Sequence, residues 1–549
     1  MTQVHPSRRS RLAVIGSAGV LALAGSVVAA LPAGAAGGNG CENRNNDTVA
    51  KLTECVTVDG VTEHLEALQG IADDNGGTRV SGSPGYDASV DYVAEQLEGA
   101  GYTVTRQPFE FPFFEQTSPS VFSRVSPDPL TFVEGTDYAV ATYSGTGDVT
   151  GVVQAVDVVI PPSPAANGNT SGCEDADFAT FTAGNIALLQ RGTCTFGEKV
   201  ANAVEAGAAG VVLFNEGQPG REDLLSPTLG APIEGAVPVV GVSHQAGVDL
   251  QGDTVRLAVT TVSELRDTEN VIAELPGRTT DNVVMAGAHL DSVAAGPGIN
   301  DNGSGSAAIL EVAQDVAETK PQNTIRFAWW GAEEYGLLGS NHYVSQLDEQ
   351  QVADIGLYLN FDMVGSPNFA RFIYDGDQSA FTAPVVVPEG SDQIEYVFED
   401  YYEQRQLPYE ATEFSGRSDY QAFILAGIPS GGLFTGAEGI KTPEQAADYG
   451  GTAGTAYDPN YHQAGDTIGN VDRDALDQNS DAIAYAVLTL AYDTARVNGV
   501  TGQPVPGGTF EGDPDARQYR QPSGMEVGGG GLSPDHGHDH DHGHGGDAV

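Results

Sequence analysis

Basic residues are scarce in this chain of 549 residues. It contains 24 Lys and Arg against 75 Asp and Glu, which gives a formal net charge of −51 at pH 7. Because binding to phosphates needs a basic surface, this deficit excludes nucleic acid from the expected partners. An acidic surface of this kind keeps an exported protein soluble, and adaptation to high salt would leave the same composition.

A long apolar run at the N-terminus extends from Leu12 to Leu31 and follows three arginines. It is long enough to span a bilayer, but it leads into Ala33-Gly34-Ala35, which satisfies the small-x-small rule for signal cleavage. We therefore predict a signal peptide over residues 1–35 and a secreted protein with no stable membrane association after cleavage. A retained membrane anchor is the alternative, and the export route stays open.

Cysteine is rare, with four residues at Cys41, Cys55, Cys173 and Cys194. No two of them have the Cys-x-x-Cys spacing of a zinc motif, so a cysteine metal site is disfavoured. An exported protein meets oxidising conditions, and the members of each pair are close in sequence. We therefore expect the disulfides Cys41–Cys55 and Cys173–Cys194, although four cysteines allow three pairings.

Strands and helices alternate in the second half of the chain. Apolar runs at 282–288, 324–330 and 355–361 predict strands, and the segments 306–318 and 335–346 predict helices. This rhythm indicates an α/β fold with a mixed, largely parallel sheet flanked by helices. The length of the chain exceeds what one hydrophobic core usually supports, so at least one further domain is expected.

A polar residue follows each of these three strands: His289, Glu333 and Asp362. Ligands of open α/β sheets bind in the crevice beyond the carboxyl ends of the strands, so the three segments should converge there. Two further segments, Asp301-Asn302-Gly and Tyr461-His462, complete a set that would bind metal. Each segment alone is an ordinary turn or helix start, but the whole set in order is hard to explain by chance.

Two divalent ions about 3.5–4 Å apart need a shared carboxylate, terminal ligands on each ion and open positions for water and substrate. We predict that His289 and Asp362 hold one ion, that Glu334 and His462 hold the other, and that Asp301 bridges them. Zinc suits this mixture of imidazole and carboxylate ligands.

Two acidic residues remain beside this ligand set. Glu333 is left without a metal, next to the position of the attacking water, where a general base belongs. Asp291 stands two residues after His289 and can accept the proton of its second ring nitrogen.

These residues resemble the M28 family of zinc peptidases and, within it, the secreted bacterial aminopeptidases. The segments that carry the likeness are Gly-Pro-Gly-Ile-Asn-Asp301, Arg-Phe-Ala-Trp-Trp-Gly-Ala-Glu-Glu334, Leu-Tyr-Leu-Asn-Phe-Asp362-Met, Ser415-Gly-Arg-Ser-Asp-Tyr420 and the surroundings of His462. They cover most of residues 262–497. The resemblance implies two zinc ions and hydrolysis of peptide substrates from the free N-terminus.

The family's pattern also suggests roles for residues outside the ligand set. Tyr461 matches an oxyanion-stabilising tyrosine, and Arg417 lies in a loop that borders the substrate in relatives. A non-proline cis peptide is implied at Asp301-Asn302. Asp477 and Asp481, which are i and i+4 on a predicted helix over 471–492, mark a possible calcium site, or else two solvated carboxylates.

One departure concerns the loop of His462. Several secreted relatives flank this histidine with a disulfide, whereas Asn460 and Gly465 stand there here. The departure puts the rigidity of this loop in doubt.

Residues 131–261 are short strands broken by Gly and Pro, and they resemble the protease-associated (PA) domain. The matching stretches are Ser171-Gly-Cys173-Glu-Asp-Ala-Asp-Phe178 and Gln190-Arg-Gly-Thr-Cys194. We expect this mainly β domain to be inserted between an N-terminal part (36–130) and a catalytic part (262–498) of the peptidase domain. Substrate access, protein contact and passive scaffolding are its possible roles.

The last segment, 499–549, ends in Asp535-His-Gly-His-Asp-His-Asp-His-Gly-His544. Its Gly, Pro and charged composition predicts a disordered tail, which could gather divalent metal or simply stay solvated.

The function expected is that of a secreted, monomeric di-zinc aminopeptidase that favours apolar N-terminal residues. One alternative is an M28-type carboxypeptidase, which would need an arginine cluster for the substrate carboxylate, and only Arg371, Arg405 and Arg417 stand out. The other is a non-catalytic binding protein on the same scaffold, which would have no need of Glu333.

Overall fold

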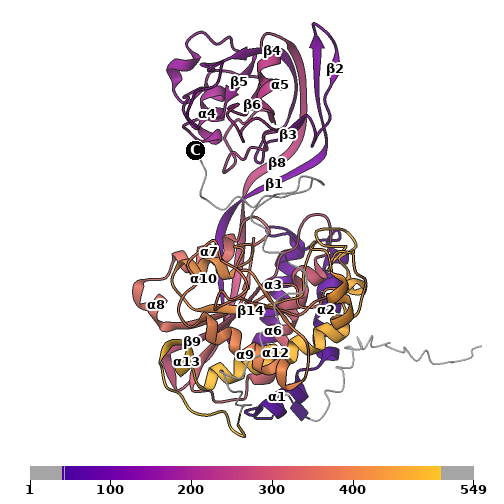
Figure 1. The fold of residues 1–549 in the computed structure, drawn as a ribbon, viewed down its shortest axis with the longest axis vertical. Helices are drawn as coiled ribbons and strands as arrows, with labels where there is room; N and C mark the ends of the chain where they lie inside the picture. The colour runs from indigo at the N-terminus through magenta and orange to yellow at the C-terminus, as the bar shows by residue number, and fades with distance from the viewer. Residues whose placement is uncertain (1–39, 42–43, 509–549) are drawn as a thin grey trace, which may run out of the picture. The chain divides into compact units, whose positions relative to one another are not determined.

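The computed structural model describes residues 40–41 and 44–508 (Figure 1). The predicted signal peptide at 1–35 and the His/Asp-rich stretch 535–544 lie outside the described residues. Val505, within the segment predicted as a tail, is 5% exposed and packs into the main hydrophobic core. Val505 therefore belongs to the folded part of the chain, although the sequence placed it in the disordered tail that was predicted to begin at residue 499.

One 14-stranded sheet organises the described residues. One part runs in the order β13 (Glu410–Thr412), β12 (Phe372–Tyr374), β14 (Ser430–Phe434), β11 (Ile355–Phe361), β9 (Thr279–His289), β10 (Asn323–Trp330) and β8 (Thr254–Leu275). It continues with β4 (Gly147–Ala155), β5 (Ile186–Gln190), β6 (Gly210–Phe214), β7 (Val239–Val242) and β3 (Tyr138–Val140). β9 pairs in parallel with both β10 and β11, and β11 with β14, which confirms the predicted mixed, largely parallel sheet.

Both faces of the central strands are buried. Along β11, Leu357, Leu359 and Phe361 pack into one hydrophobic core and Tyr358 into a second core on the opposite face. Successive side chains of a strand point to opposite faces, so two buried faces favour apolar residues at most positions. This explains why β11 is mainly apolar in sequence; the buried Asn360 is the polar exception and donates to Ser418 Oγ.

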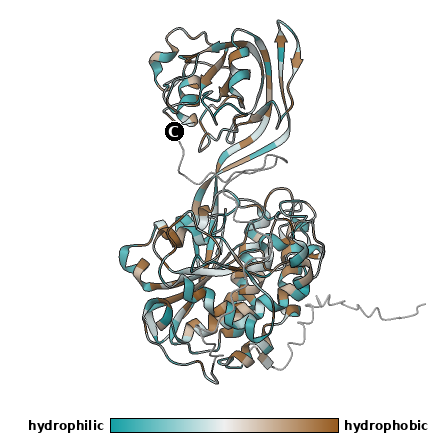
Figure 2. Ribbon diagram, in the orientation of Figure 1, coloured by the Kyte–Doolittle hydropathy of each residue, from teal (hydrophilic) through white to brown (hydrophobic). Residues whose placement is uncertain are grey.

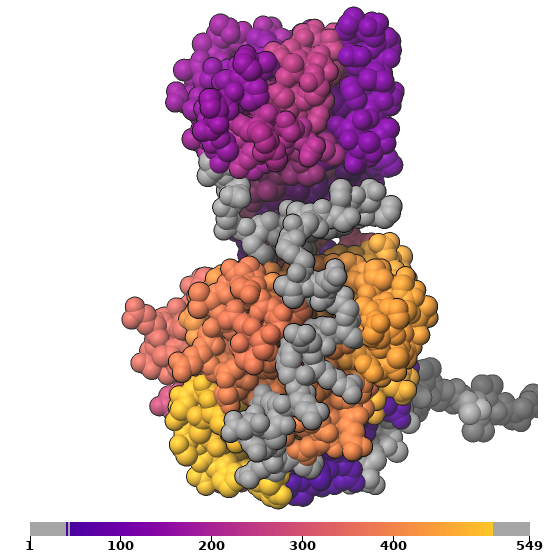
Figure 3. Space-filling model, in the orientation of Figure 1, coloured from indigo at the N-terminus to yellow at the C-terminus, as the bar shows by residue number. Residues whose placement is uncertain are grey.

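Helices cover the two faces (Figure 1). The first core contains residues of α1 (Val49–Cys55), α2 (Val58–Asp74), α3 (Pro84–Gly99), α6 (Gly305–Val316), α9 (Ser391–Gln404) and α12 (Arg473–Tyr492). The second contains residues of α7 (Leu338–Ser345) and α10 (Tyr420–Leu425), with α8 (Glu349–Asp354) beside them. The shorter segments are η2 (Asp175–Phe178), α4 (Phe196–Glu205), α5 (His244–Asp249), η3 (Ile299–Ser304), α11 (Pro443–Tyr449), η4 (Ile468–Asn470) and α13 (Ala495–Asn498). Residues far apart in sequence meet in this layer, as where α1 packs against α12. In Figure 3, indigo atoms from the start of the chain lie beside yellow atoms from its end.

The alternating sequence of residues 102–106 predicts a short strand, but strand β1 (Thr103–Ser126) is far longer. It pairs with β8 from Thr103 opposite Glu274 to Ser126 opposite Thr254, and with β2 (Leu130–Thr131) only near its end. Over most of its length β1 is thus an edge strand, where Pro108 and Pro112 cost no ladder hydrogen bond. Figure 2 shows brown and teal residues interspersed along β1 and β8. In β1, Phe111 and Phe113 are buried, whereas Arg266 and Glu264 of β8 lie opposite them, so the face that they share is not purely apolar.

Two helix starts also differ from expectation. The helix predicted at 335–346 begins only at Leu338, because Gly336 and Leu337 adopt positive φ angles of 104° and 60°. These two residues instead form a turn whose amides donate to the carbonyl of Glu333. The stretch Ser-Gly-Ser-Pro-Gly at 81–85 predicts a loop, but Pro84 is the first residue of α3, a position where its missing N–H costs nothing.

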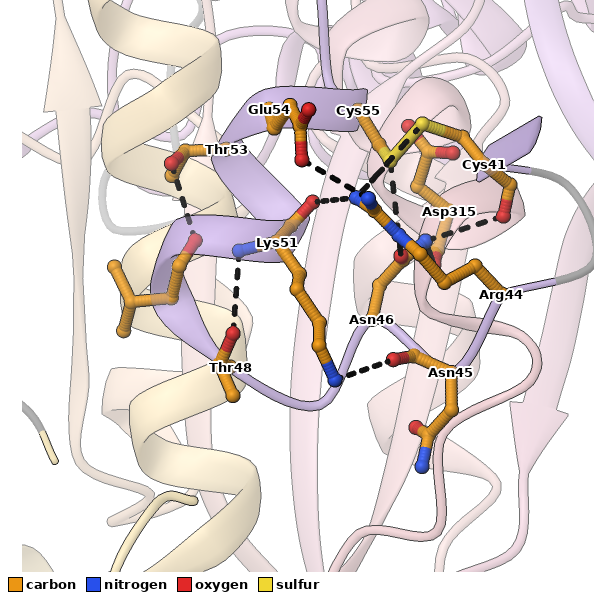
Figure 4. The surroundings of a disulfide bond; sticks show 11 residues. Cys41, Arg44, Asn45, Asn46, Thr48, Lys51, Thr53, Glu54, Cys55 and Asp315 are labelled. Atoms are coloured by element: carbon orange, nitrogen blue, oxygen red, sulfur yellow. Dashed lines mark hydrogen bonds and ion pairs between the residues drawn. A yellow bond between two sulfur atoms is a disulfide. The ribbon is translucent and has the colours of Figure 1, made fainter. Parts of the chain in front are cut away.

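Both predicted disulfides are present, Cys41–Cys55 and Cys173–Cys194. The first ties the described N-terminal segment to α1 (Figure 4). Arg44 lies against it, with one guanidinium nitrogen 2.8 Å from Cys55 Sγ and 2.7 Å from the carbonyl of Lys51. Within the described ranges, no helix is both long and apolar enough to cross a membrane.

Candidate metal centre

The carboxyl edge of the central strands brings the predicted ligands together. His289 is the last residue of β9, Glu333 and Glu334 follow β10, and Asp362 follows β11 directly. Asp301 arrives from η3, which precedes α6, and His462 from the loop before η4. All six side chains line one pocket.

Asp301 stands between the two imidazoles. Its Oδ1 is 3.2 Å from His289 Nε2, and its Oδ2 is 3.1 Å from His462 Nε2. His289 Nε2 is also 3.4 Å from Asp362 Oδ1, and His462 Nε2 is 3.1 Å from Glu334 Oε2. The two predicted ligand triads therefore each converge on a point, with one oxygen of Asp301 facing each.

The chemistry of these donors fits cations. Asp362 Oδ1 and Glu334 Oε1 are buried and have no hydrogen-bond partner among the described residues. Four carboxylates, those of Asp301, Glu333, Glu334 and Asp362, surround only two imidazoles. Buried carboxylates left unpaired are costly, and divalent ions would relieve both the missing contacts and the mutual repulsion.

The pKa values of the donors reflect this crowding. Burial raises the pKa of Glu334 to about 7, opposed by His462 and reinforced by Asp301. Burial would raise the pKa of Asp301 as well, but hydrogen bonds from His289 and His462 hold that pKa below its usual value. Burial lowers the pKa of His462, yet Glu334 and Asp301 outweigh it and bring that pKa to about 11. The imidazoles thus act as the cations of this site in the absence of metal.

Glu333 lies at the same edge, with its Oε2 3.9 Å from His289 Nε2. Burial raises its pKa well above the usual value, and the charges of Asp362 and Glu334 add to this after the opposing effect of His289. One carboxylate oxygen of Glu333 lies within 4.8 Å of a ring nitrogen of His289 and of a carboxylate oxygen of Glu334. These three residues therefore form a third group of potential metal ligands. Its position is therefore suited to a proton acceptor, and distance alone does not separate that role from metal binding.

The neighbours of His289 hold its ring in place. Its Nδ1 is 3.3 Å from the carbonyl oxygen of Asp291 and 3.5 Å from Asp291 Oδ1, the residue predicted to orient it. Asp291 Oδ1 also accepts the amide of Glu333 at 3.2 Å. One carboxylate thus connects the segments of His289 and Glu333, as the partners of metal ligands commonly do.

Sequence reasoning missed Arg79, which is fully buried behind this loop. Its guanidinium donates to the carbonyls of Leu290, Pro297 (2.9 Å) and Gly298 (2.6 Å). Burial lowers its pKa to about 10, although Asp291 and Asp466 oppose this. Arg79 therefore fastens the segments of His289 and Asp301 to each other, which no local motif around Gly-Gly-Thr-Arg could show.

The loop of His462 is tethered by polar groups instead of the disulfide found in some relatives. Asp466 accepts the amides of Asn300 and Asp301 at 2.8 and 3.0 Å. Asp458 accepts from Asn300 Nδ2 at 2.6 Å and from Asn470 Nδ2 at 2.9 Å. We call Asp458, Asp466, Asn300 and Asn470 the polar clamp. The clamp links the loop of His462 to Asp301. In the sequence, its two acidic members are isolated residues, Asp458 and Asp466, so no local motif pointed to it.

A further hydrogen bond orients Asp362. Ser418 Oγ donates to Asp362 Oδ2 at 2.6 Å, and Asn360 Nδ2 donates to Ser418 Oγ at 2.8 Å. This arrangement leaves Asp362 Oδ1 facing His289. The peptide between Asp301 and Asn302 is cis, as the resemblance implied.

Tyr461 and Arg417 lie at the mouth of the pocket. The Tyr461 ring stacks on that of His462 with centroids 3.9 Å apart, and its hydroxyl accepts from Arg417 Nη2 at 3.3 Å. Arg417 is also paired with Glu438 at 2.6 Å. Tyr461 and Arg417, the two residues predicted to contact the substrate, therefore both line this pocket.

The predicted calcium residues lie elsewhere, on α12. Asp477 is exposed, and Asp481 is hydrogen-bonded to Tyr401. Neither belongs to a group of three or more potential ligand residues among those described. A calcium site there stays a prediction.

Comparison with known proteins agrees with this geometry. Residues 270–487 match the model of peptidase family M28, and residues 153–250 match that of the PA domain. The chain is 48% identical over 454 residues to an aminopeptidase of Pseudomonas aeruginosa, covering 81% of this chain and 83% of that protein. It is 41% identical over 434 residues to leucine aminopeptidase 2 of Trichophyton rubrum, covering 78% of this chain and 83% of that protein.

Solved structures show the same fold. An aminopeptidase from Aneurinibacillus sp. strain AM-1 has a TM-score of 0.58 at 24% identity, covering 86% of this chain and 100% of that chain. A zinc aminopeptidase from Bacillus subtilis has a TM-score of 0.50 at 25% identity, covering 78% of this chain and 94% of that chain. The chain therefore belongs to peptidase family M28, and it is a metallo-aminopeptidase that carries a PA domain.

Proposed function

We propose that this enzyme is a secreted di-zinc aminopeptidase that removes the N-terminal residue of peptides. The observation that carries the proposal is the placement of Asp301, whose two oxygens each face a different imidazole at 3.2 and 3.1 Å. A single ion would use one triad, whereas two triads that share a bidentate carboxylate are the arrangement of a two-metal site.

In this proposal His289, Asp301 and Asp362 hold one zinc ion, and Asp301, Glu334 and His462 hold the other. When bound, zinc supplies a Lewis acid that polarises the scissile carbonyl and makes water a better nucleophile. The hydrogen bond from Ser418 and the polar clamp keep Asp362, Asp301 and His462 in position, so little reorganisation is needed on binding.

Glu333 acts as the general base. Its buried Oε2 takes a proton from the attacking water and later returns it to the leaving amine. Burial raises the pKa of Glu333, which favours the protonated state that it reaches after accepting the proton of water. Tyr461 accepts a hydrogen bond from Arg417, which leaves its own O–H free to donate to the oxyanion of the tetrahedral intermediate.

The pocket wall beyond the ligands supports a preference for apolar N-terminal residues. Met363, Tyr374, Tyr420, Phe434 and Ala437 line it. A side chain such as leucine would bury its surface against this wall. The relative from Trichophyton rubrum is itself named a leucine aminopeptidase.

The alternatives fit the pocket less well. A carboxypeptidase needs several cations for the substrate carboxylate, yet Arg417 is the single Lys or Arg among the described residues that line the pocket. Arg371 is buried and donates to Gln478 Oε1 at 2.8 Å, and Arg405 covers the ring of Tyr401. A binding protein without catalysis would leave the buried Glu333 unexplained.

The remaining expectations belong to the same proposal: the PA domain over 131–261, peptidase parts at 36–130 and 262–498, a monomer, secretion through residues 1–35, and calcium at Asp477 and Asp481. The two disulfides support an oxidising compartment. A calcium-selective chelator tests the last point, because an unchanged melting temperature would remove it.

The proposed activity is tested with leucine p-nitroanilide and its N-acetyl derivative. The zinc-loaded enzyme should release p-nitroaniline from the free amine only, and metal analysis should give two zinc ions per chain. Equal cleavage of the blocked substrate, or cleavage of C-terminal residues from N-blocked peptides, would contradict aminopeptidase action.

A further inference from the structure

The pocket contains one charged side chain that the proposed reaction does not use. Glu413 directly follows β13 and lines the pocket together with the apolar wall. Its side chain is half-buried and forms no hydrogen bond or ion pair with another described residue. Its main-chain carbonyl is occupied, because it accepts the amide of Ser415 at 3.0 Å.

The other charges of the pocket are accounted for. Asp301, Glu334 and Asp362 are the proposed zinc ligands, and Glu333 is the proposed base. Arg417 is paired with Glu438 at 2.6 Å. Once metal is bound, Glu413 is the one pocket charge without a counter-charge among the described residues.

We infer that Glu413 is a specificity-determining residue that admits lysine and arginine as N-terminal residues beside the apolar ones. The inference rests on the proposed aminopeptidase function. Lysine and arginine have apolar stems and a cationic tip. The stem would lie along Met363, Tyr374 and Phe434, and the tip would meet the carboxylate of Glu413.

An aliphatic side chain would use the same wall without the carboxylate, so both substrate classes share one subsite. An acidic N-terminal residue would meet like charge and be rejected. The expected specificity is therefore broad for apolar and basic residues and poor for Asp and Glu.

The test uses lysine and norleucine p-nitroanilides, which share a stem length and differ in the charge. The measured quantity is the ratio of kcat/KM for lysine to that for norleucine, with zinc-loaded enzyme. In Glu413→Gln this ratio should fall about tenfold, mainly through KM for lysine, because one ion pair is lost. Glu413→Asp should retain part of the ratio, and added salt should lower it in the wild type.

Glu438→Gln is the control, since it removes the same charge from a residue that does not line the pocket. Its ratio should stay within about twofold of the wild type, because a charge in water acts weakly at a distance. An unchanged ratio in Glu413→Gln, or an equal fall in Glu438→Gln, overturns the inference. Absence of activity on both substrates in the wild type would instead refute the proposed function.

Discussion

The metal centre and the PA domain both bury charged side chains, but these side chains have different neighbours in the two regions. In the PA domain, Lys199 is fully buried and donates to the carbonyl of Ser171 at 2.6 Å, and the buried Glu216 pairs with Arg221 at 3.0 Å. In the metal centre, four carboxylates surround two imidazoles, and Glu334 Oε1 and Asp362 Oδ1 have no hydrogen-bond partner among the described residues. A buried charge with an adjacent partner needs no ligand, whereas converging like charges favour a bound cation.

Replacement of Glu333 should have the largest effect. Glu333→Gln removes the proton acceptor but keeps the volume, so kcat should fall by about 10³-fold or more while two zinc ions stay bound. Turnover of leucine p-nitroanilide and zinc content measure the two effects. Glu216→Gln, in the PA domain, is the matched control and should leave kcat within about twofold. A comparable loss in both variants would show that the two buried glutamates do not differ in role.

The disulfide of the PA domain should matter for stability alone. A double replacement, Cys173→Ser with Cys194→Ser, opens a loop with a sequence separation of 21. The free energy of unfolding should fall by about 3 kcal/mol, measured by urea denaturation. Turnover at 25 °C should not change, and a lower kcat in the folded variant would mean that the PA domain takes part in catalysis.

The polar clamp should affect metal affinity. Asp466→Asn places an amide group where two backbone N–H groups now donate, so one of these donors loses its acceptor. Zinc affinity should fall about 10- to 100-fold, as measured by competition with a chelator. Asp249→Asn on the PA domain is the control, and an affinity equal to wild type in Asp466→Asn would show that the clamp does not position the ligands.

Asp481 should have the smallest effect, and one that depends on pH. Burial raises its pKa to about 7, and Asp477 adds to this while Arg405 opposes it. The native state therefore holds a proton that the unfolded chain, with a pKa of about 3.9, has released. Stability contributed by this group falls as pH rises from about 4 to about 7 and stays lost above that.

Asp481→Asn cannot ionise, so it should be more stable than the wild type at pH 8 by about 1–2 kcal/mol and similar to it at pH 4. Thermal melting at both pH values measures this. If calcium binds here, it should raise the melting temperature of the wild type but not of the variant. A variant less stable than the wild type at pH 8 without calcium would contradict the assigned pKa.

The central strands and the ligands that follow them were predictable because their causes are local. Burial on both faces favours largely apolar strands such as β11. A polar residue at the carboxyl end of such a strand, such as Asp362, lies at the edge of the sheet where ligands bind. The order of the ligand segments along the chain then indicated which residues meet.

Longer-range features were not predictable in the same way. A strand was expected only over residues 102–106, whereas β1 runs to Ser126. Pro108 and Pro112 fit a strand at the edge of a sheet, and position in a sheet is a tertiary property. The helix after Glu333 was expected too early, because Gly336 and Leu337 form a turn on the carbonyl of Glu333.

The amino-acid order alone thus indicated the α/β class and the residue types that gather at the pocket, since each follows from patterns of a few neighbours, and it favoured the disulfide pairs that the structure has. Folding in three dimensions added Arg79 behind the loops, the polar clamp and the position of Glu413 in the pocket. Arg79 and the polar clamp act through partners that lie up to 219 positions away in the chain, as between Arg79 and Gly298. Contacts between residues so far apart leave no periodic pattern in the sequence, so they can be identified only from the folded structure.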